Sequence, residues 1–157
     1  MMRRYMKYAV MIMCAAMVCI VTACGDDDEY DKNVTNVHYV VKTSVDLQSL
    51  YTVTVSYSDL SGVEHTFQMK DMAQWEYRDK VSGDVPLSCK VVAVANELND
   101  LDDRTYYFNY ESSVHYYRQV GGAHSVDEGE KGWRVEKADM EKFISEHPTI
   151  VILDFAK

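Results

Sequence analysis

The chain has 157 residues, with 16 lysines and arginines against 25 aspartates and glutamates, a net charge of −9 at neutral pH. This length accommodates one ordinary domain. The acidic balance argues against nucleic acid and anionic membrane surfaces as partners, because both would repel the protein.

The first 23 residues have the features of a secretory signal. Arg3, Arg4 and Lys7 give a positive start, and the run from Tyr8 to Ala23 is apolar and uncharged. At 16 residues this run is shorter than the roughly 20 that a transmembrane helix needs. Residues 1–23 are therefore predicted to be a leader that is removed.

A cysteine follows the leader directly. The stretch Val21-Thr22-Ala23-Cys24 places a small residue before the cysteine. It resembles a lipobox, the cleavage and lipidation site of bacterial lipoproteins, although Val21 stands where leucine is commonest in that family. The resemblance implies a lipid on Cys24 that anchors the protein to a membrane, since each buried methylene contributes about 0.8 kcal/mol.

Four acidic residues come just after the cysteine: Asp26, Asp27, Asp28 and Glu29. This run resembles the acidic run that follows the cysteine in Bacteroidetes-type surface lipoproteins, where it looks like a signal for export to the outer leaflet of the outer membrane. The resemblance implies a lipid-anchored protein on the cell surface. The alternatives are a solvated linker and a protein that faces the periplasm. Residues 24–36 are predicted to be an acidic tether, and 37–157 a single β-rich domain.

Cleavage before Cys24 would change the charge and the cysteine chemistry. The leader contains three basic residues and no acidic ones, so 13 basic and 25 acidic residues would remain, a net charge of −12. Cys14 and Cys19 leave with the leader, so Cys89 has no partner for an internal disulfide. Cys89 lies on the apolar phase of a predicted strand, where we expect a buried small residue and not a nucleophile.

The first half of the domain alternates between apolar and polar residues, as half-buried strands do. Strands are predicted over Val37–Val45, Tyr51–Tyr57 and Val63–Lys70. The Asp59-Leu60-Ser61-Gly62 stretch predicts a hairpin turn between the last two. The segment Met72–Arg78 predicts a short strand or a crossing.

The second half adds strands and one helix. Val85–Ala95 predicts a strand covered on both faces, and Thr105–Val120 predicts the longest strand. Gly121–Lys131 has little apolar content and is expected to be a mobile loop. Met140, Phe143, Ile144 and His147 are spaced as an amphipathic stripe, which predicts a helix over Asp139–His147. The apolar run Ile150–Phe155 predicts an interior strand.

These elements predict a mainly β fold. We expect an antiparallel β-sandwich, immunoglobulin-like or transthyretin-like in layout, with the C-terminal helix at one end or edge. The alternative is an α+β fold with the helix packed on an antiparallel sheet. The alternating tyrosines and valines and the Asp-x-Ser-Gly turn resemble those of uncharacterised small β-sandwich lipoproteins of the same Bacteroidetes type.

The sequence contains no motif of a known enzyme class, such as His-Glu-x-x-His or Gly-x-Ser-x-Gly. Its histidines are scattered and lack the spacing of a metal pair. Asp100, Asp102 and Asp103 offer the oxygen ligands that calcium prefers, but their loop lacks the glycine and distant glutamate of the helix–loop–helix calcium motif. A solvated acidic loop is the expectation, and no cofactor or metal is predicted.

Four aromatic residues are the candidate ligand-binding residues: Trp75, Tyr107, Tyr117 and Trp133. The two tyrosines share the polar phase of the longest predicted strand with Asn109, Glu111 and His115. Exposed rings of this kind suit stacking on sugars or burial in a protein interface. The alternative is that a second layer, such as the helix containing Met140 and Phe143, covers that face.

Together these features predict a cell-envelope lipoprotein that acts as a non-catalytic binding or accessory module for a glycan or a protein. One alternative is a structural subunit whose edge strand pairs with a neighbour. Another is a hydrolase that uses dispersed carboxylates such as Glu111, which would need a cleft and a carboxylate pair roughly 5 to 9 Å apart.

Overall fold

The computed structural model of the chain describes residues 34–118 and 122–157, with the backbone alone for 122–128. Residues Asn33–Lys157 form one compact unit. The predictions for the leader, for Cys24 and for the acidic run 26–29 lie outside the described residues.

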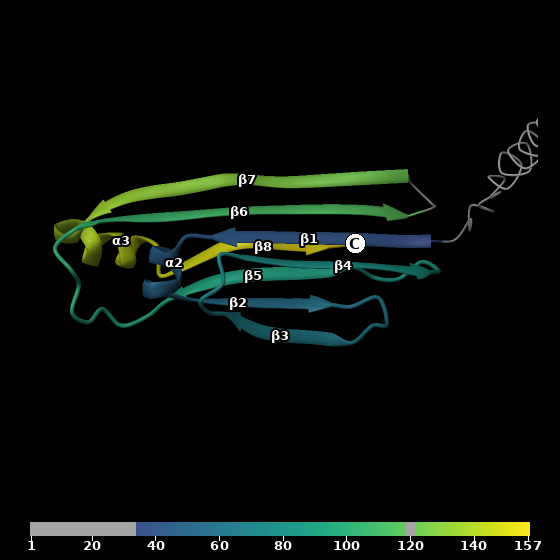
Figure 1. Ribbon diagram of the computed structural model, residues 1–157, viewed down its shortest axis with the longest axis horizontal. Coiled ribbons are helices and arrows are strands. Elements are labelled where there is room, and N and C mark those ends of the chain that lie inside the picture. Colours follow the sequence, from purple (N-terminus) through teal and green to yellow (C-terminus); the bar gives the residue numbers. More distant parts are fainter. Residues whose placement is uncertain (1–33, 119–121) are drawn as a thin grey trace, which may run out of the picture. The chain divides into compact units, whose positions relative to one another are not determined.

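Within the described residues, eight strands form two antiparallel four-stranded sheets (Figure 1). Sheet A has the order β4-β1-β6-β7, with β4 (Gln74–Ser82), β1 (Val34–Thr43), β6 (Thr105–Arg118) and β7 (Gly122–Glu136). Sheet B has the order β3-β2-β5-β8, with β3 (Glu64–Met69), β2 (Tyr51–Ser58), β5 (Ser88–Ala95) and β8 (Thr149–Ala156). The helical elements are α2 (Val45–Leu50), the 3₁₀ turn η1 (Lys137–Asp139) and α3 (Met140–Glu146).

The predicted antiparallel β-sandwich is confirmed, and α3 lies at one end of it, the same end as α2 in Figure 1. The strand order differs from that of immunoglobulin domains. The first two strands of such a domain share a sheet, whereas β1 and β2 belong to different sheets here.

The core lies between the sheets and is built from alternate residues of each strand. On β1 the inward residues Val37, Tyr39 and Val41 are buried, and on β6 Phe108 and Val114 are fully buried. Successive side chains of a strand point to opposite faces, so the alternate residues of β6, such as Tyr107, Asn109 and Glu111, point away from the core.

Helix α3 closes one end of this core. Met140 and Phe143 are buried, as the amphipathic stripe predicted. The Phe143 ring stacks on Phe108, with 4.9 Å between the ring centroids, and lies edge-on to Trp133 at 5.7 Å. The helix therefore covers an end of the sandwich and not a face of a sheet.

The prediction of a mobile loop over Gly121–Lys131 is wrong for the residues that the structure describes. Strand β7 begins at Gly122 and pairs with β6 along its length. Low apolar content misled the prediction, because an edge strand is held mainly by backbone hydrogen bonds to its one neighbour.

Strand β8 was predicted to be interior, and this is also wrong, because β8 is an edge strand that pairs with β5. A register shift opposite Val91/Val92 allows both Ile152 and Leu153 to be buried. Because of this shift, two successive residues of the apolar run Ile150–Phe155 are buried on one face of the strand. The other face is not covered, and Val151 is 52% exposed.

The start and end of β1 differ from the prediction as well. The strand begins at Val34, inside the segment predicted as a tether, and ends at Thr43. Ser44 then caps α2 by accepting a hydrogen bond from the Leu47 amide at 3.3 Å. A serine side chain at this position favours a helix start over strand continuation.

Candidate functional site

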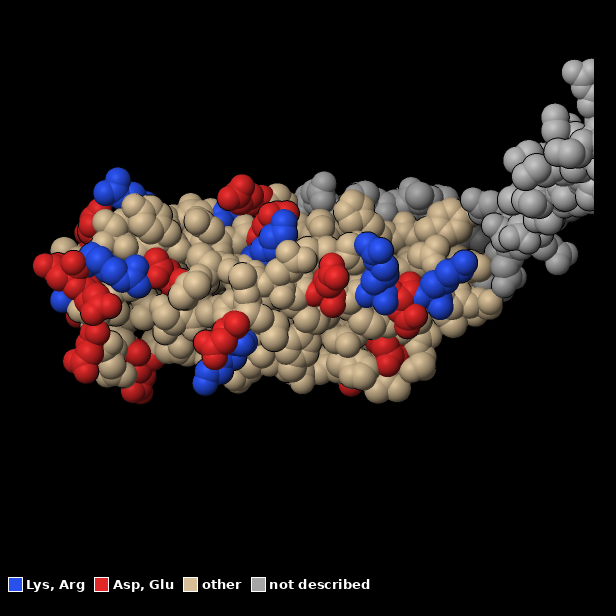
Figure 2. All heavy atoms as spheres, viewed as in Figure 1, with Lys and Arg blue, Asp and Glu red and all other residues tan. Residues whose placement is uncertain are grey.

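The outward residues of β1 and β6 form the centre of an exposed surface, which we call the outer face of sheet A (Figure 2). Tyr107, Asn109, Glu111 and His115 are exposed on β6, and Tyr117 is half-buried. Neither α2 nor α3 lies over this face in Figure 1. The second layer that the sequence left open as an alternative therefore does not cover the two tyrosines.

Tyr107 is held by residues that follow the end of β1. The Tyr107 amide donates to Asp46 Oδ2 at 2.7 Å, and Ser44 Oγ donates to the Tyr107 carbonyl at 2.8 Å. The Asn109 amide in turn donates to Ser44 Oγ at 3.0 Å. Side chains thus take over the pairing of β6 where β1 stops, and they fix the backbone beneath a ring that is 50% exposed.

Asp46 is the electrostatic centre of this support. Arg104 donates to both of its carboxylate oxygens, at 2.7 and 3.1 Å, and the Asp46 side chain is only 13% exposed. The hydrogen bond from Arg104 is the main cause that lowers the pKa of Asp46, with a further contribution from the Tyr107 amide. The Arg104 guanidinium also lies 4.0 Å above the Tyr106 ring.

Replacing Asp46 with asparagine is expected to destabilise the domain by about 1–3 kcal/mol at pH 7, because it leaves donors without their charged acceptor. A carboxyl whose pKa is lowered by folding stabilises the protein above its unfolded pKa of about 4, and this contribution disappears as the pH falls through the folded pKa. Urea unfolding of both proteins should therefore show a difference that shrinks below pH 4. A difference that stays constant between pH 7 and pH 2 would contradict this role.

Beside Tyr107 lies an open polar hollow of about 250 Å³, lined by Lys42, Thr43, Ser44, Asn109, Tyr110, Glu111 and Glu130. Lys42 Nζ donates to both oxygens of Glu111, at 2.9 and 3.0 Å. Glu130 is the cross-strand partner of Glu111 on β7. The ammonium of Lys42, the amide of Asn109 and the carboxylates of Glu111 and Glu130 are therefore presented together on the outer face of sheet A, where they can bond to the hydroxyl groups of a ligand.

The two tryptophans do not belong to this face. Trp75 on β4 packs inward against Tyr57 and Phe67, with ring centroids 5.3 and 5.7 Å away. Trp133 on β7 packs against Phe143 and His147, at 5.7 and 5.3 Å. The four predicted aromatics thus divide between the outer face of sheet A, which holds the tyrosines, and the interior edges of the same sheet.

The weak calcium candidates remain a solvent-exposed acidic loop. Asp100, Asp102 and Asp103 are exposed, and Asp102 lies 3.9 Å from the Arg104 guanidinium. No group of three or more histidine, cysteine or acidic residues in the described part of the chain could hold a metal ion. Cys89 is buried, as predicted, and burial raises the pKa of its thiol to about 12. It is therefore a protonated core residue at neutral pH.

Lys42, Ser44, Asp46 and Arg104 are the site residues that the sequence did not identify. Lys42 stands on the polar phase of its strand, but only the pairing of β1 with β6 shows that it reaches Glu111. Ser44 caps a helix, although it lies within the predicted strand Val37–Val45, and Asp46 stands in the first turn of that helix, just after the predicted strand.

Comparison of the chain with protein-family models, with curated proteins and with solved structures finds no match. Among the described residues, no helix is both long and apolar enough to cross a membrane.

Proposed function

We propose that the protein is a cell-envelope lipoprotein whose β-sandwich is a non-catalytic binding module, and that the outer face of sheet A binds a glycan. The observation that carries the proposal is Tyr107, which is 50% exposed on an uncovered sheet beside the polar hollow. A tyrosine ring offers a flat apolar surface with a polar rim, which suits a sugar ring. The anchor and the location rest on the lipobox-like residues that end at Cys24.

The surroundings of Tyr107 favour a glycan over a protein. The core of a protein interface is apolar and poor in charge, whereas Tyr107 has the polar hollow beside it. The exposed large hydrophobic residues among those described lie in five different parts of the chain: Val45, Val63, Val94, Tyr107 and Val151. They do not form an apolar patch on the outer face of sheet A.

The hollow also favours binding over catalysis. Glu111, the carboxylate that the hydrolase alternative names, is 48% exposed and bound to Lys42. A catalytic carboxylate pair acts on a bond held between its members, and this open face has no such enclosure.

Replacing Tyr107 with alanine is expected to weaken glycan binding about tenfold or more, because the loss of one stacked ring amounts to about 1.4 kcal/mol. The measurement is a glycan array with the soluble domain, followed by calorimetry of the best glycan with each variant. Val94→Ala is the matched control, since Val94 is 48% exposed on β5 of sheet B. An array without any bound glycan, or equal affinities of the wild type and Tyr107→Ala, would end the proposal.

A further inference from the structure

One end of the outer face of sheet A carries a group of positive side chains. Two neighbouring rows run across β4, β1 and β6, because these strands pair in register. The first row is Arg78, His38 and His115, and the second is Lys80, Asn36 and Tyr117. These six positions contain no carboxylate, in a chain with 25 acidic residues.

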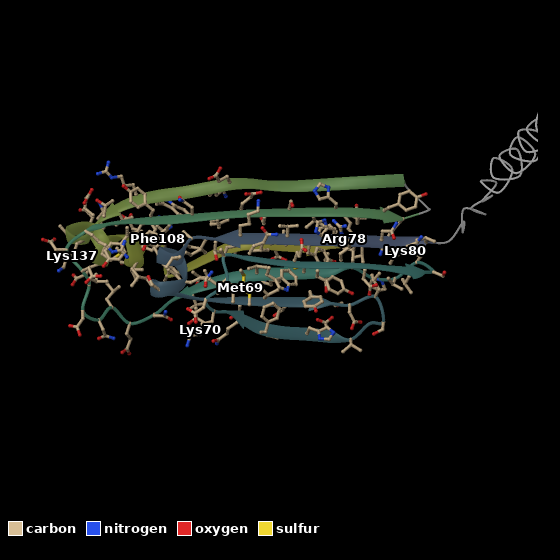
Figure 3. All side chains as sticks on the ribbon, viewed as in Figure 1. Met69, Lys70, Arg78, Lys80, Phe108 and Lys137 are labelled. Atoms are coloured by element: carbon tan, nitrogen blue, oxygen red, sulfur yellow. The ribbon has the colours of Figure 1, made fainter. Side chains whose placement is uncertain are left out.

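The two cations in these rows differ from most others that the structure describes. Lys42, Lys90, Arg104, Arg118, Arg134 and Lys142 each have a carboxylate within 4.0 Å. Within the same described ranges, Arg78 and Lys80 make no such ion pair. Figure 3 shows the two side chains near each other at the end of β4, far from Lys70 and Lys137. Their charge is therefore available to a ligand.

Arg78 is oriented by its neighbour across the sheet. Its guanidinium lies 3.3 Å from His38 Nδ1, and a guanidinium is only a donor, so the proton of a neutral His38 is on Nε2. His38 Nε2 lies 3.4 Å from Glu76, in the next row, and the His115 ring centroid is 6.3 Å from that of His38.

We propose that these two rows, which we call the cationic rows, bind the carboxylate of a uronic-acid sugar in the glycan ligand. A guanidinium fork matches a carboxylate with two parallel hydrogen bonds, and Lys80 adds a second charge. This inference rests on the proposed glycan-binding function. Tyr107 and His115 are eight residues apart on β6, about 26 Å at roughly 3.3 Å per residue, so one extended oligosaccharide would reach from the tyrosine to the cationic rows.

The charge of the whole protein limits the ligand. A densely charged polymer such as nucleic acid would be repelled by the net negative charge of the protein, −9 at neutral pH. A sugar chain with one acid group carries far less negative charge, so the acidic residues of the protein repel it less. The partner expected from charge complementarity is therefore an acidic glycan.

The test uses a neutral galacto-oligosaccharide that ends in one galacturonic acid residue, together with the methyl ester of that residue, which keeps the sugars and removes the charge. Calorimetry is expected to show that the soluble domain binds the acid form about tenfold or more tightly than the ester at low salt. The double variant Arg78→Ala/Lys80→Ala should lose this preference and bind the ester as the wild type does. Lys90→Ala, which changes an exposed lysine of sheet B, should keep the preference.

Equal affinity of the wild type for the acid form and the ester would overturn this inference, and so would a double variant that still prefers the acid form. Neither result affects the proposal that Tyr107 binds a glycan. That proposal is tested separately by comparing the affinities of the wild type and Tyr107→Ala for the uncharged ester. The absence of binding to both forms would also overturn the uronic-acid assignment, while the glycan array then decides the proposed function separately. Circular dichroism of each variant confirms that the exposed substitutions leave the fold intact.

Discussion

Replacing Phe108 with alanine is expected to destabilise the domain by about 3–5 kcal/mol, the cost of removing a buried aromatic ring. Phe108 is fully buried and joins three elements. Its ring stacks on Phe143 of α3 at 4.9 Å and meets Tyr51 of β2 edge-on at 6.0 Å. Loss of this ring would leave a cavity where sheet A, sheet B and the C-terminal helix meet.

Urea unfolding followed by tryptophan fluorescence measures this loss, because Trp133 lies against Phe143. Tyr107→Ala is the matched control, since it removes an aromatic ring from the neighbouring residue of the same strand, whose side chain is exposed. It should cost far less. If Phe108→Ala does not fold, Phe108→Leu should show an intermediate loss. A loss below about 1 kcal/mol for Phe108→Ala would contradict the assignment of this ring to the centre of the core.

Replacing Tyr39 with phenylalanine is expected to stabilise the domain by about 1 kcal/mol or more, because it removes a buried hydroxyl that lacks a hydrogen bond. Tyr39 is fully buried, and its hydroxyl has no partner among the described residues. Burial also raises the pKa of Tyr39, with Cys89 and Tyr77 as further causes. The ring contacts to Tyr77 and Phe155, each at 6.0 Å, would remain in the variant.

Tyr51→Phe provides the control with the opposite sign. Tyr51 is also buried, but its hydroxyl donates to the His147 carbonyl at 2.8 Å. Its removal should destabilise the domain by about 1 kcal/mol, the net contribution of a typical hydrogen bond. Thermal unfolding of both variants gives the comparison. If Tyr39→Phe lowers the melting temperature as Tyr51→Phe does, the Tyr39 hydroxyl has a partner and the account of this core position is wrong.

The sandwich was predictable because alternation depends only on the strand period, which the sequence displays directly. The same period placed Tyr107 and Tyr117 on the face opposite Phe108, and the structure agrees. Trp75 and Trp133 were harder, because loops beside them suggested exposure. Trp75 stands opposite Val41, a buried residue of β1, so its strand phase points inward. That phase is visible only once the pairing partner is known.

The proposed binding face, the outer face of sheet A, could be predicted only in part. Its β6 residues follow from one strand, but Lys42, Arg78 and Lys80 join it through strand order, which composition and periodicity do not contain. The support of Tyr107 by Asp46 depends on α2, a six-residue helix too short to show a full amphipathic period. Strand β7 was missed because backbone pairing with β6 holds it without a strong apolar pattern.

The most direct test of the central claim is a titration of the ¹⁵N-labelled soluble domain with a glycan selected on the array, followed by ¹H–¹⁵N NMR spectra. Binding on the outer face of sheet A predicts that the largest shifts fall on amides of β1 and β6, around Lys42 and from Tyr107 to Glu111. Shifts concentrated on β5 and β8 of sheet B, or a spectrum that the glycan leaves unchanged, would contradict the claim.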